Sequence, residues 1–138
     1  MKIFFQSGII PFRNVGKNLE ILLITSLNKK NWIIPKGLVE ECLSPKESAI
    51  KEAYEEAGVS GEIHAATIGE YQYQKWGGIC IVQVFPFSVT KIHEQWPESA
   101  VRNRRWFTYN QAVAKITNIQ LRVLFTKFAK RHNNQSQP

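Results

Sequence analysis

The chain has 138 residues, of which 43% are apolar and 21% charged, and its formal net charge is +7. This length suits one folded domain, which we place at residues 1–132, followed by a disordered tail at residues 133–138. No apolar run reaches the ~20 residues that cross a bilayer, and the start lacks a signal-peptide core, so the sequence excludes a membrane-spanning protein and predicts a cytoplasmic one.

The excess of basic residues predicts attraction to polyanions such as phosphorylated metabolites or nucleic acid. The chain contains no aspartate, which accounts for part of this imbalance, so the charge alone favours no partner. Cys42 and Cys80 lie far apart without the spacing of metal ligands. We therefore predict that both are free thiols.

The first predicted elements are strands. Residues 2–13 are rich in Ile and Phe and contain Pro11, which favours a strand near a sheet edge. A continuous apolar strand is predicted at residues 19–25, and a short one at residues 32–34 stops at Pro35.

A helix is predicted at residues 45–57. Ser44 suits the N-cap, Pro45 the first helical position and Glu47 the third, which completes a capping box. Gly58 suits the end, because glycine adopts the left-handed conformation after a last helical turn without steric cost.

Two longer strands are predicted at residues 62–74 and 79–90, joined as a hairpin across residues 75–78. Residues 104–107 suit one more strand. Residues 117–131 show helical spacing, with Thr117 and Gln120 placed as a capping box. Strands, a helix, further strands and a final helix predict an α+β layered domain.

Acidic side chains gather on one edge of the predicted helix. At 100° per residue, Glu52, Glu55 and Glu56 fall within about 100° of one another. Like charges at this spacing destabilise a helix, so a positive group should offset them. Lys46 and Lys51 could do so on a solvated acidic face; alternatively, the carboxylates could hold a hard divalent cation such as Mg²⁺.

The residues around these glutamates resemble a known motif. Gly37, followed fourteen residues later by KEAYEEAGV at residues 51–59, resembles the Nudix box, Gly-x5-Glu-x7-Arg-Glu-U-x-Glu-Glu-x-Gly-U, in which U is apolar. The entry WIIPKG at residues 32–37 also resembles this family. The Arg-x-Arg-x-Trp-Phe segment at residues 102–107 is similar to that of diadenosine and diphosphoinositol polyphosphate hydrolases. The resemblance covers most of the chain and implies a Nudix hydrolase domain, an α/β/α sandwich with a mixed sheet.

Two positions depart from the box. The first glutamate of the family is Leu43 here, and its arginine is Lys51. Losing both members of a supporting pair leaves no unpaired charge behind, but a lysine cannot reproduce the planar fork of arginine. We expect the site to work with reduced preorganisation.

The resemblance implies Mg²⁺, or alternatively Mn²⁺, as the cofactor. It assigns the metal to Glu52, Glu56, Glu55 and the backbone carbonyl of Lys36. Glu55 is the expected general base, with Glu52 or a glutamate from a later loop as alternatives. The candidates for that later carboxylate are Glu70, Glu94 and Glu98.

The expected function is hydrolysis of a phosphoric anhydride in a nucleoside polyphosphate, dinucleoside polyphosphate or similar metabolite. The candidate phosphate ligands are Arg13, Lys36, Arg102 and Arg104, and Trp76, at the predicted hairpin tip, could stack on a base. The alternatives are removal of pyrophosphate from an RNA 5′ end, which is not favoured because no track of alternating cations and aromatics is evident, and a non-catalytic module that binds a nucleotide or a protein. The expected assembly is a monomer or a homodimer.

Overall fold

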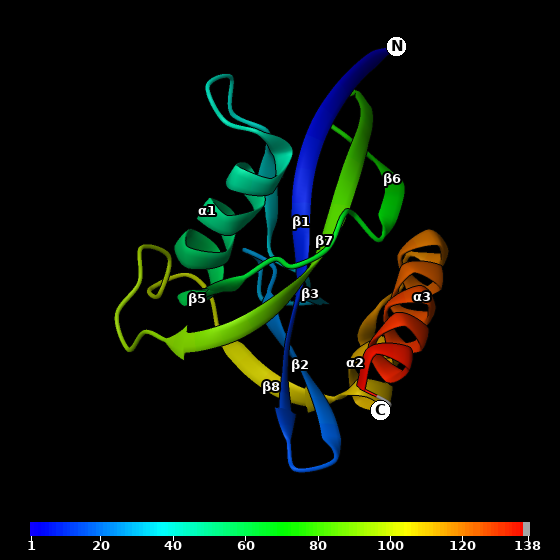
Figure 1. Ribbon diagram of the computed structural model, residues 1–138. Helices are drawn as coiled ribbons and strands as arrows, with labels where there is room; N and C mark the ends of the chain where they lie inside the picture. The colour runs from blue at the N-terminus through cyan, green and yellow to red at the C-terminus, as the bar shows by residue number, and fades with distance from the viewer. Residues whose placement is uncertain (137–138) are drawn as a thin grey trace.

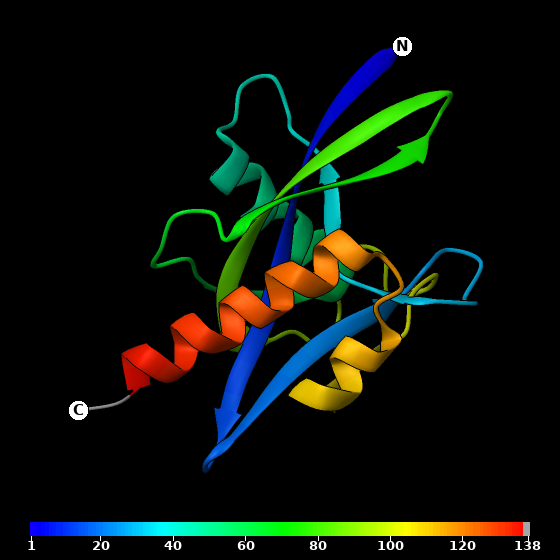
Figure 2. The same ribbon diagram turned by 90° about the vertical axis from the view of Figure 1, so that its right-hand side faces the viewer.

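A computed structural model describes residues 1–136 and shows one mixed sheet between helices (Figure 1). One helix, α1, covers one face of this sheet, and α2 and α3 cover the other, which confirms the predicted α/β/α sandwich (Figures 1 and 2). Within the described residues the elements are β1 (Lys2–Val15), β2 (Asn18–Thr25), β3 (Trp32–Ile33), β4 (Lys36–Leu38), α1 (Pro45–Ala57), β5 (Val59–Glu62), β6 (Gly69–Lys75), β7 (Gly78–Ile92), β8 (Arg104–Thr108), α2 (Tyr109–Lys115) and α3 (Ile119–Ser136).

The core has two parts because side chains alternate between the two faces of the sheet. Ile10 of β1 packs with Leu124 and Phe125 of α3, whereas the adjacent Ile9 packs with Ala49 and Ala53 of α1. Strands covered on both faces need continuous apolar runs, which β1 and β2 supply. Among the described residues, no helix combines the length and the hydrophobicity needed to cross a membrane.

The central strand is β1, and the edge position predicted from Pro11 is wrong. One edge of β1 pairs in parallel with β7 from Lys2 to Phe12. The other edge pairs antiparallel with β4 at Gln6–Gly8 and then with β2 from Phe12. Pro11 lies between these two partners, where neither ladder requires the N–H that proline lacks.

The predicted start and end of α1 are confirmed. The Ser44 hydroxyl accepts from the Glu47 amide at 3.0 Å, and the Glu47 carboxylate accepts from the Ser44 amide at 2.9 Å. Gly58 has φ 64° and ends the helix in the left-handed conformation. Both signals are local in sequence, which is why they could be identified without the fold.

The single strand predicted at residues 62–74 is wrong, because this segment holds the end of β5, a loop and β6. These two strands pair with different parts of the long β7: β6 from Gly78 to Val84, and β5 from Ser88 to Ile92. The predicted hairpin is confirmed, since Lys75 pairs with Gly78 across the two-residue turn Trp76 and Gly77.

The C-terminal helices differ from the prediction in two ways. The short α2 was not predicted, although Thr108 and Gln111 form its capping box. The capping box predicted at Thr117 and Gln120 is wrong: Asn118 accepts from the Leu121 amide at 3.0 Å, and Gln120 instead accepts from the Gln72 amide.

The last helix also extends further than predicted. It continues to Ser136, so residues 133–136 are helical where a disordered tail was expected, and residues 137–138 lie outside the described part of the chain. Both cysteines are free thiols, as predicted.

Candidate functional site

A cleft of about 850 Å³ opens where β4 meets the C-terminal half of α1. Two kinds of charge line it. The acidic side chains are Glu40, Glu52 and Glu56, and the basic ones are Lys36, Lys75 and Arg102. Carboxylates and cations in one open cleft can bind a metal ion and an anionic ligand together.

Glu56 is the buried carboxylate of the cleft, with a side chain 10% exposed. The backbone N–H of Lys36 donates to its Oε1 at 3.0 Å, and Arg102 donates to its Oε2 at 3.1 Å. Burial nevertheless raises the pKa of Glu56 to about 7, although the Lys36 amide and the Arg102 charge both lower it. Desolvation therefore outweighs the two partners.

Glu52 lies one turn earlier on α1, and its carboxyl group rests against Gly37 of β4. No hydrogen bond or ion pair engages this carboxyl within residues 1–136. Burial, and then the charges of Glu56 and Glu55, raise its pKa to about 7. The cleft thus contains negative charge that the described protein groups leave without a counter-ion.

These features fit a hard divalent cation. The donors are oxygen atoms, and the mutual repulsion of Glu52 and Glu56 would be relieved by a positive ion between them. Across residues 1–136, however, no three His, Cys, Asp or Glu side chains converge as a complete ligand set. Further ligands must come from water, phosphate oxygens or backbone carbonyls, which suits Mg²⁺ because it usually retains several waters.

The third glutamate of the predicted set, Glu55, does not line the cleft. Its carboxylate lies on the partly exposed edge of α1, 3.7 Å from Lys51 Nζ. Lys51 also pairs with Glu40, from the loop before α1, at 2.6 Å. Glu40, for which the sequence predicted no role, provides a carboxylate near the helix although the box position at Leu43 lacks one.

Arg102 lines the cleft, but its guanidinium is committed to protein groups. It donates to Glu98 at 2.8 Å, to the Thr25 carbonyl at 3.0 Å and to Glu56, and it is 8% exposed. Arg102 therefore positions Glu56, and Glu98 orients Arg102. The other two candidates for a later carboxylate, Glu70 and Glu94, are exposed and lie outside the lining.

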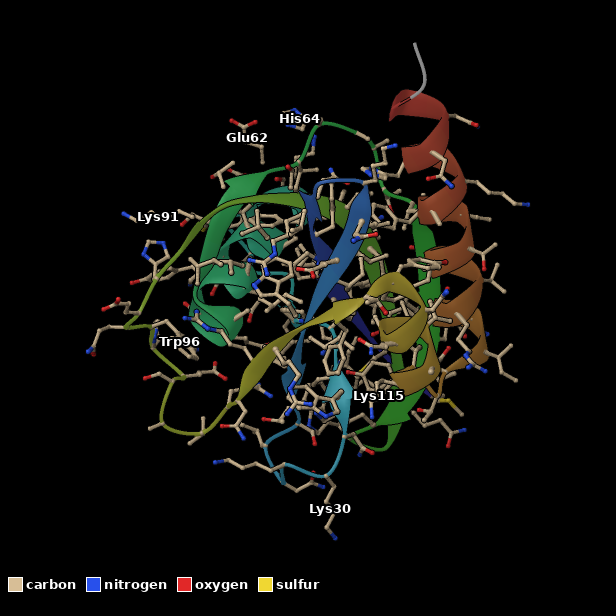
Figure 3. The ribbon with its side chains drawn as sticks, turned by 90° about the horizontal axis from the view of Figure 1, so that it is seen from below. Lys30, Glu62, His64, Lys91, Trp96 and Lys115 are labelled. Carbon is tan, nitrogen blue, oxygen red and sulfur yellow. The ribbon has the colours of Figure 1, made fainter. Side chains whose placement is uncertain are left out.

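Two predicted phosphate ligands, Arg13 and Arg104, lie outside the cleft lining. Arg13 pairs with Glu20 at 2.8 Å and stacks on Trp106. Arg104 donates to the Ala57 carbonyl at 2.9 Å and packs on Trp96, which lies in the loop between β7 and β8 (Figure 3). A cation at the end of α1 complements the helix dipole, so Arg104 stabilises the helix that carries the glutamates.

Lys36 and Lys75 are the cleft cations that form no close ion pair among the described residues, although Lys36 interacts electrostatically with Glu56. The Lys36 ammonium lies 5.1 Å from the Tyr73 ring centroid, and burial lowers its pKa. A second pocket of about 230 Å³ adjoins the cleft at Lys36 and Tyr73, and Trp32, Tyr71 and Leu121 line its apolar wall. Lys75 and Tyr73 were not predicted as site residues, because the parallel pairing of β7 with β1, which the sequence did not indicate, brings the β6–β7 hairpin to the cleft.

Gly37→Ala tests the contact between β4 and Glu52. A Cβ at position 37 would overlap the Glu52 carboxyl group, which is the mobile end of a side chain. We expect the free energy of unfolding to change by less than about 1 kcal/mol, whereas any metal-dependent turnover should fall roughly 100-fold, because the carboxylate is displaced by about 1 Å. Urea unfolding and steady-state kinetics measure the two effects. Unchanged turnover would contradict a role for this contact.

The two raised pKa values predict how Mg²⁺ stabilises the protein. Glu52 and Glu56 have folded pKa values of about 7, above the usual 4.5, so the stability they contribute is full below pH 4.5 and is lost as the pH rises through 7. Mg²⁺ binds the ionised forms, so it should raise Tm more at pH 8 than at pH 5.5. NaCl at equal ionic strength is the control. An equal Mg²⁺ effect at both pH values would contradict this site.

Known proteins resemble this chain in sequence and in fold. A family model described as the NUDIX domain matches residues 6–128. The chain is 34% identical over 130 residues to Nudix hydrolase 21, chloroplastic, of Arabidopsis thaliana, covering 90% of this chain and 65% of that relative. It is 32% identical over 110 residues to diphosphoinositol polyphosphate phosphohydrolase 3-alpha of Mus musculus, covering 78% of this chain and 66% of that relative. It thus spans about two thirds of the length of each.

Solved structures share the fold. The crystal structure of C. elegans Ap4A hydrolase superposes with a TM-score of 0.77 at 20% identity, covering 94% of this chain and 98% of that one. At this identity the likeness concerns the fold alone. With the family match over residues 6–128, the box-like segment on α1 and the shared sandwich, this chain belongs to the Nudix family.

Proposed function

We propose that this chain hydrolyses a phosphoric anhydride bond in a nucleoside polyphosphate, a dinucleoside polyphosphate or a similar polyphosphorylated metabolite, by means of activated water. One observation carries the proposal. The cleft places the carboxylates of Glu52 and Glu56 beside the cations Lys36 and Lys75. Glu52, which has no ion-pair partner among the described residues, and the neighbouring Glu56 suit a metal ion, and the adjacent cations suit the phosphates that this ion would contact.

Glu52, Glu56 and the backbone carbonyl of Lys36 would hold the cation, with Mg²⁺ the first choice and Mn²⁺ the second. When bound, the cation supplies charge neutralisation at phosphate oxygens and a lowered pKa for water. Arg102 and the Lys36 amide fix the Glu56 carboxylate in place. Lys36 and Lys75 would hold the phosphates and stabilise the charge that develops on them.

Glu52 and Glu55 are the candidates for the general base. A base must reach the water that it deprotonates. Glu52 lines the cleft and lacks an ion-pair partner within the described residues, whereas Glu55 lies outside the lining and pairs with Lys51. The geometry therefore favours Glu52, in place of the Glu55 assignment suggested by the resemblance.

The apolar pocket beside the cleft favours a nucleotide among the possible substrates. Its aromatic wall adjoins Lys36, so a base could enter it while the phosphates stay near the carboxylates. Aromatic and apolar walls with a few polar groups are typical of small-molecule sites. Two relatives whose names state a substrate act on diphosphoinositol polyphosphate and Ap4A, both of which contain phosphoric anhydrides.

The test is phosphate or pyrophosphate release from diadenosine polyphosphates, nucleoside triphosphates, ADP-ribose and 5′-triphosphorylated RNA, with Mg²⁺ or with EDTA. Mg²⁺-dependent turnover of a small molecule supports the proposal. Turnover of the RNA alone would identify an RNA 5′-pyrophosphohydrolase. Nucleotide binding without any turnover would identify a non-catalytic module. The cytoplasmic location and the monomeric or homodimeric state stay predictions from the sequence.

A further inference from the structure

Trp76 occupies an unfavourable backbone conformation at the tip of the β6–β7 hairpin. The turn consists of Trp76 and Gly77, with φ 54° and 69°. Two positive φ values match a type I′ turn, for which Asn-Gly is strongly preferred. A bulky side chain with positive φ is a backbone outlier, and such strain concentrates at functional positions.

Trp76 is also largely exposed to solvent, although it is a large aromatic residue. The residue is 53% exposed and lines the cleft beside Lys75. Its ring meets Phe4 of β1 edge to face, with centroids 5.2 Å apart, and Lys75 Nζ lies 4.8 Å from its centroid. Phe4 therefore supports the indole from one side while about half of the residue stays open to solvent.

Cations accompany the aromatic rings in this cluster. Lys2 lies 5.3 Å from the Phe4 ring centroid, and Lys75 lies over Trp76. The hairpin tip lies at the same end of the sheet as the loop before α1 (Figure 1). An exposed indole beside lysines is the chemistry that holds a nucleobase and its phosphates, because every base can stack on an indole.

We propose that Trp76 is a stacking platform for a nucleobase of a ligand whose phosphates lie in the cleft. Lys75 then binds a phosphate on the cleft side, and the edge-to-face contact with Phe4 fixes the orientation of the indole. The ligand class is a nucleotide or dinucleotide with a polyphosphate chain, rather than a polyphosphate without an aromatic group. The inference rests on the proposed function in placing the phosphates near Glu52 and Glu56.

The decisive variant is Trp76→Asn, because it removes the indole and gives the turn its preferred sequence. A purely structural role for Trp76 predicts a lower Tm, whereas relief of the positive-φ strain predicts an unchanged or higher Tm. Phe5→Ala is the matched control, since Phe5 is also an exposed aromatic at this end of the sheet but does not line the cleft.

The measurement is the Kd, by calorimetry with Mg²⁺, of diadenosine tetraphosphate and inorganic tripolyphosphate, each as a methylene-bridged analogue that resists hydrolysis, so that Glu52 stays in place. Trp76→Asn should weaken the binding of diadenosine tetraphosphate by roughly 5- to 100-fold. It should change the Kd of tripolyphosphate by less than about twofold and should not lower Tm. Trp76→Phe should restore most of the affinity.

Equal effects on diadenosine tetraphosphate and tripolyphosphate, or no effect on either, would overturn the platform even if the wild-type protein hydrolyses both. Conversely, a selective loss of diadenosine tetraphosphate binding in a protein that turns over nothing would support the platform and overturn the hydrolase assignment. The binding assay therefore tests the stacking platform and the turnover assay tests the hydrolase assignment, so either hypothesis can be rejected without the other.

Discussion

Glu52→Gln is expected to lower metal-dependent turnover by roughly 100- to 10,000-fold, the contribution typical of general acid–base groups. The amide keeps the size of the side chain but can neither accept the water's proton nor supply a full negative charge. Because the carboxyl of Glu52 repels Glu56, the substitution should not lower Tm in the absence of metal. Steady-state kinetics over a Mg²⁺ titration, together with thermal unfolding, test both statements.

Glu55→Gln is the matched control for this prediction, since Glu55 lies on the same helix but outside the cleft lining. The turnover of Glu55→Gln should fall much less than that of Glu52→Gln, because only the contact between residue 55 and Lys51 is altered. If Glu55→Gln proved inactive and Glu52→Gln retained activity, the roles of the two glutamates would be exchanged. If both retained full activity, the proposed site would be wrong.

Arg102→Met is expected to cause the largest loss of stability, about 3–5 kcal/mol in the free energy of unfolding at pH 8. Arg102 and Glu56 are 8% and 10% exposed at the side chain, so removing the guanidinium leaves a buried carboxylate without its cation. The loss should shrink below about pH 5, where Glu56 is protonated. Urea unfolding at both pH values measures it.

Two further variants make this prediction specific. The double variant Arg102→Met with Glu56→Gln should recover much of the lost stability, because no buried charge remains. Arg13→Met removes an arginine from a more exposed pair with Glu20 and from its stacking on Trp106, and should cost no more than about 2 kcal/mol. A similar loss in Arg13→Met and Arg102→Met would show that burial is not the cause.

Local signals in the sequence were sufficient for α1 and for the hairpin turn. Ser44, Glu47 and Gly58 form contacts with residues a few positions away, so their roles follow from spacing alone. The capping box of α2 was equally local and could have been found at Thr108 and Gln111. The division between β5 and β6 could not, because it depends on which part of β7 each strand pairs with.

The site shows the same limit. The glutamates of α1 were predictable from the resemblance, but the residues that pair with the charged side chains of α1 come from distant segments. Arg102 lies 46 residues from Glu56, and Glu40 reaches Lys51 over 11 residues through the path of a loop. Arg13 and Arg104 were plausible phosphate ligands by residue type, yet tertiary packing directs them to Glu20 and to the end of α1.

The change of partner along β1 bears on how this architecture could acquire new specificities. Because β1 pairs first with β4 and then with β2, the backbone at Gly37 and the α1 glutamates are positioned by the sheet itself. The groups that would contact the rest of the substrate, such as Lys75 and Trp76, lie at the tip of the β6–β7 hairpin, on the other edge of β1. Substitutions at that tip would therefore alter the proposed contacts with the rest of the substrate and leave the carboxylates of α1 in place, so selection could act on recognition and on chemistry independently.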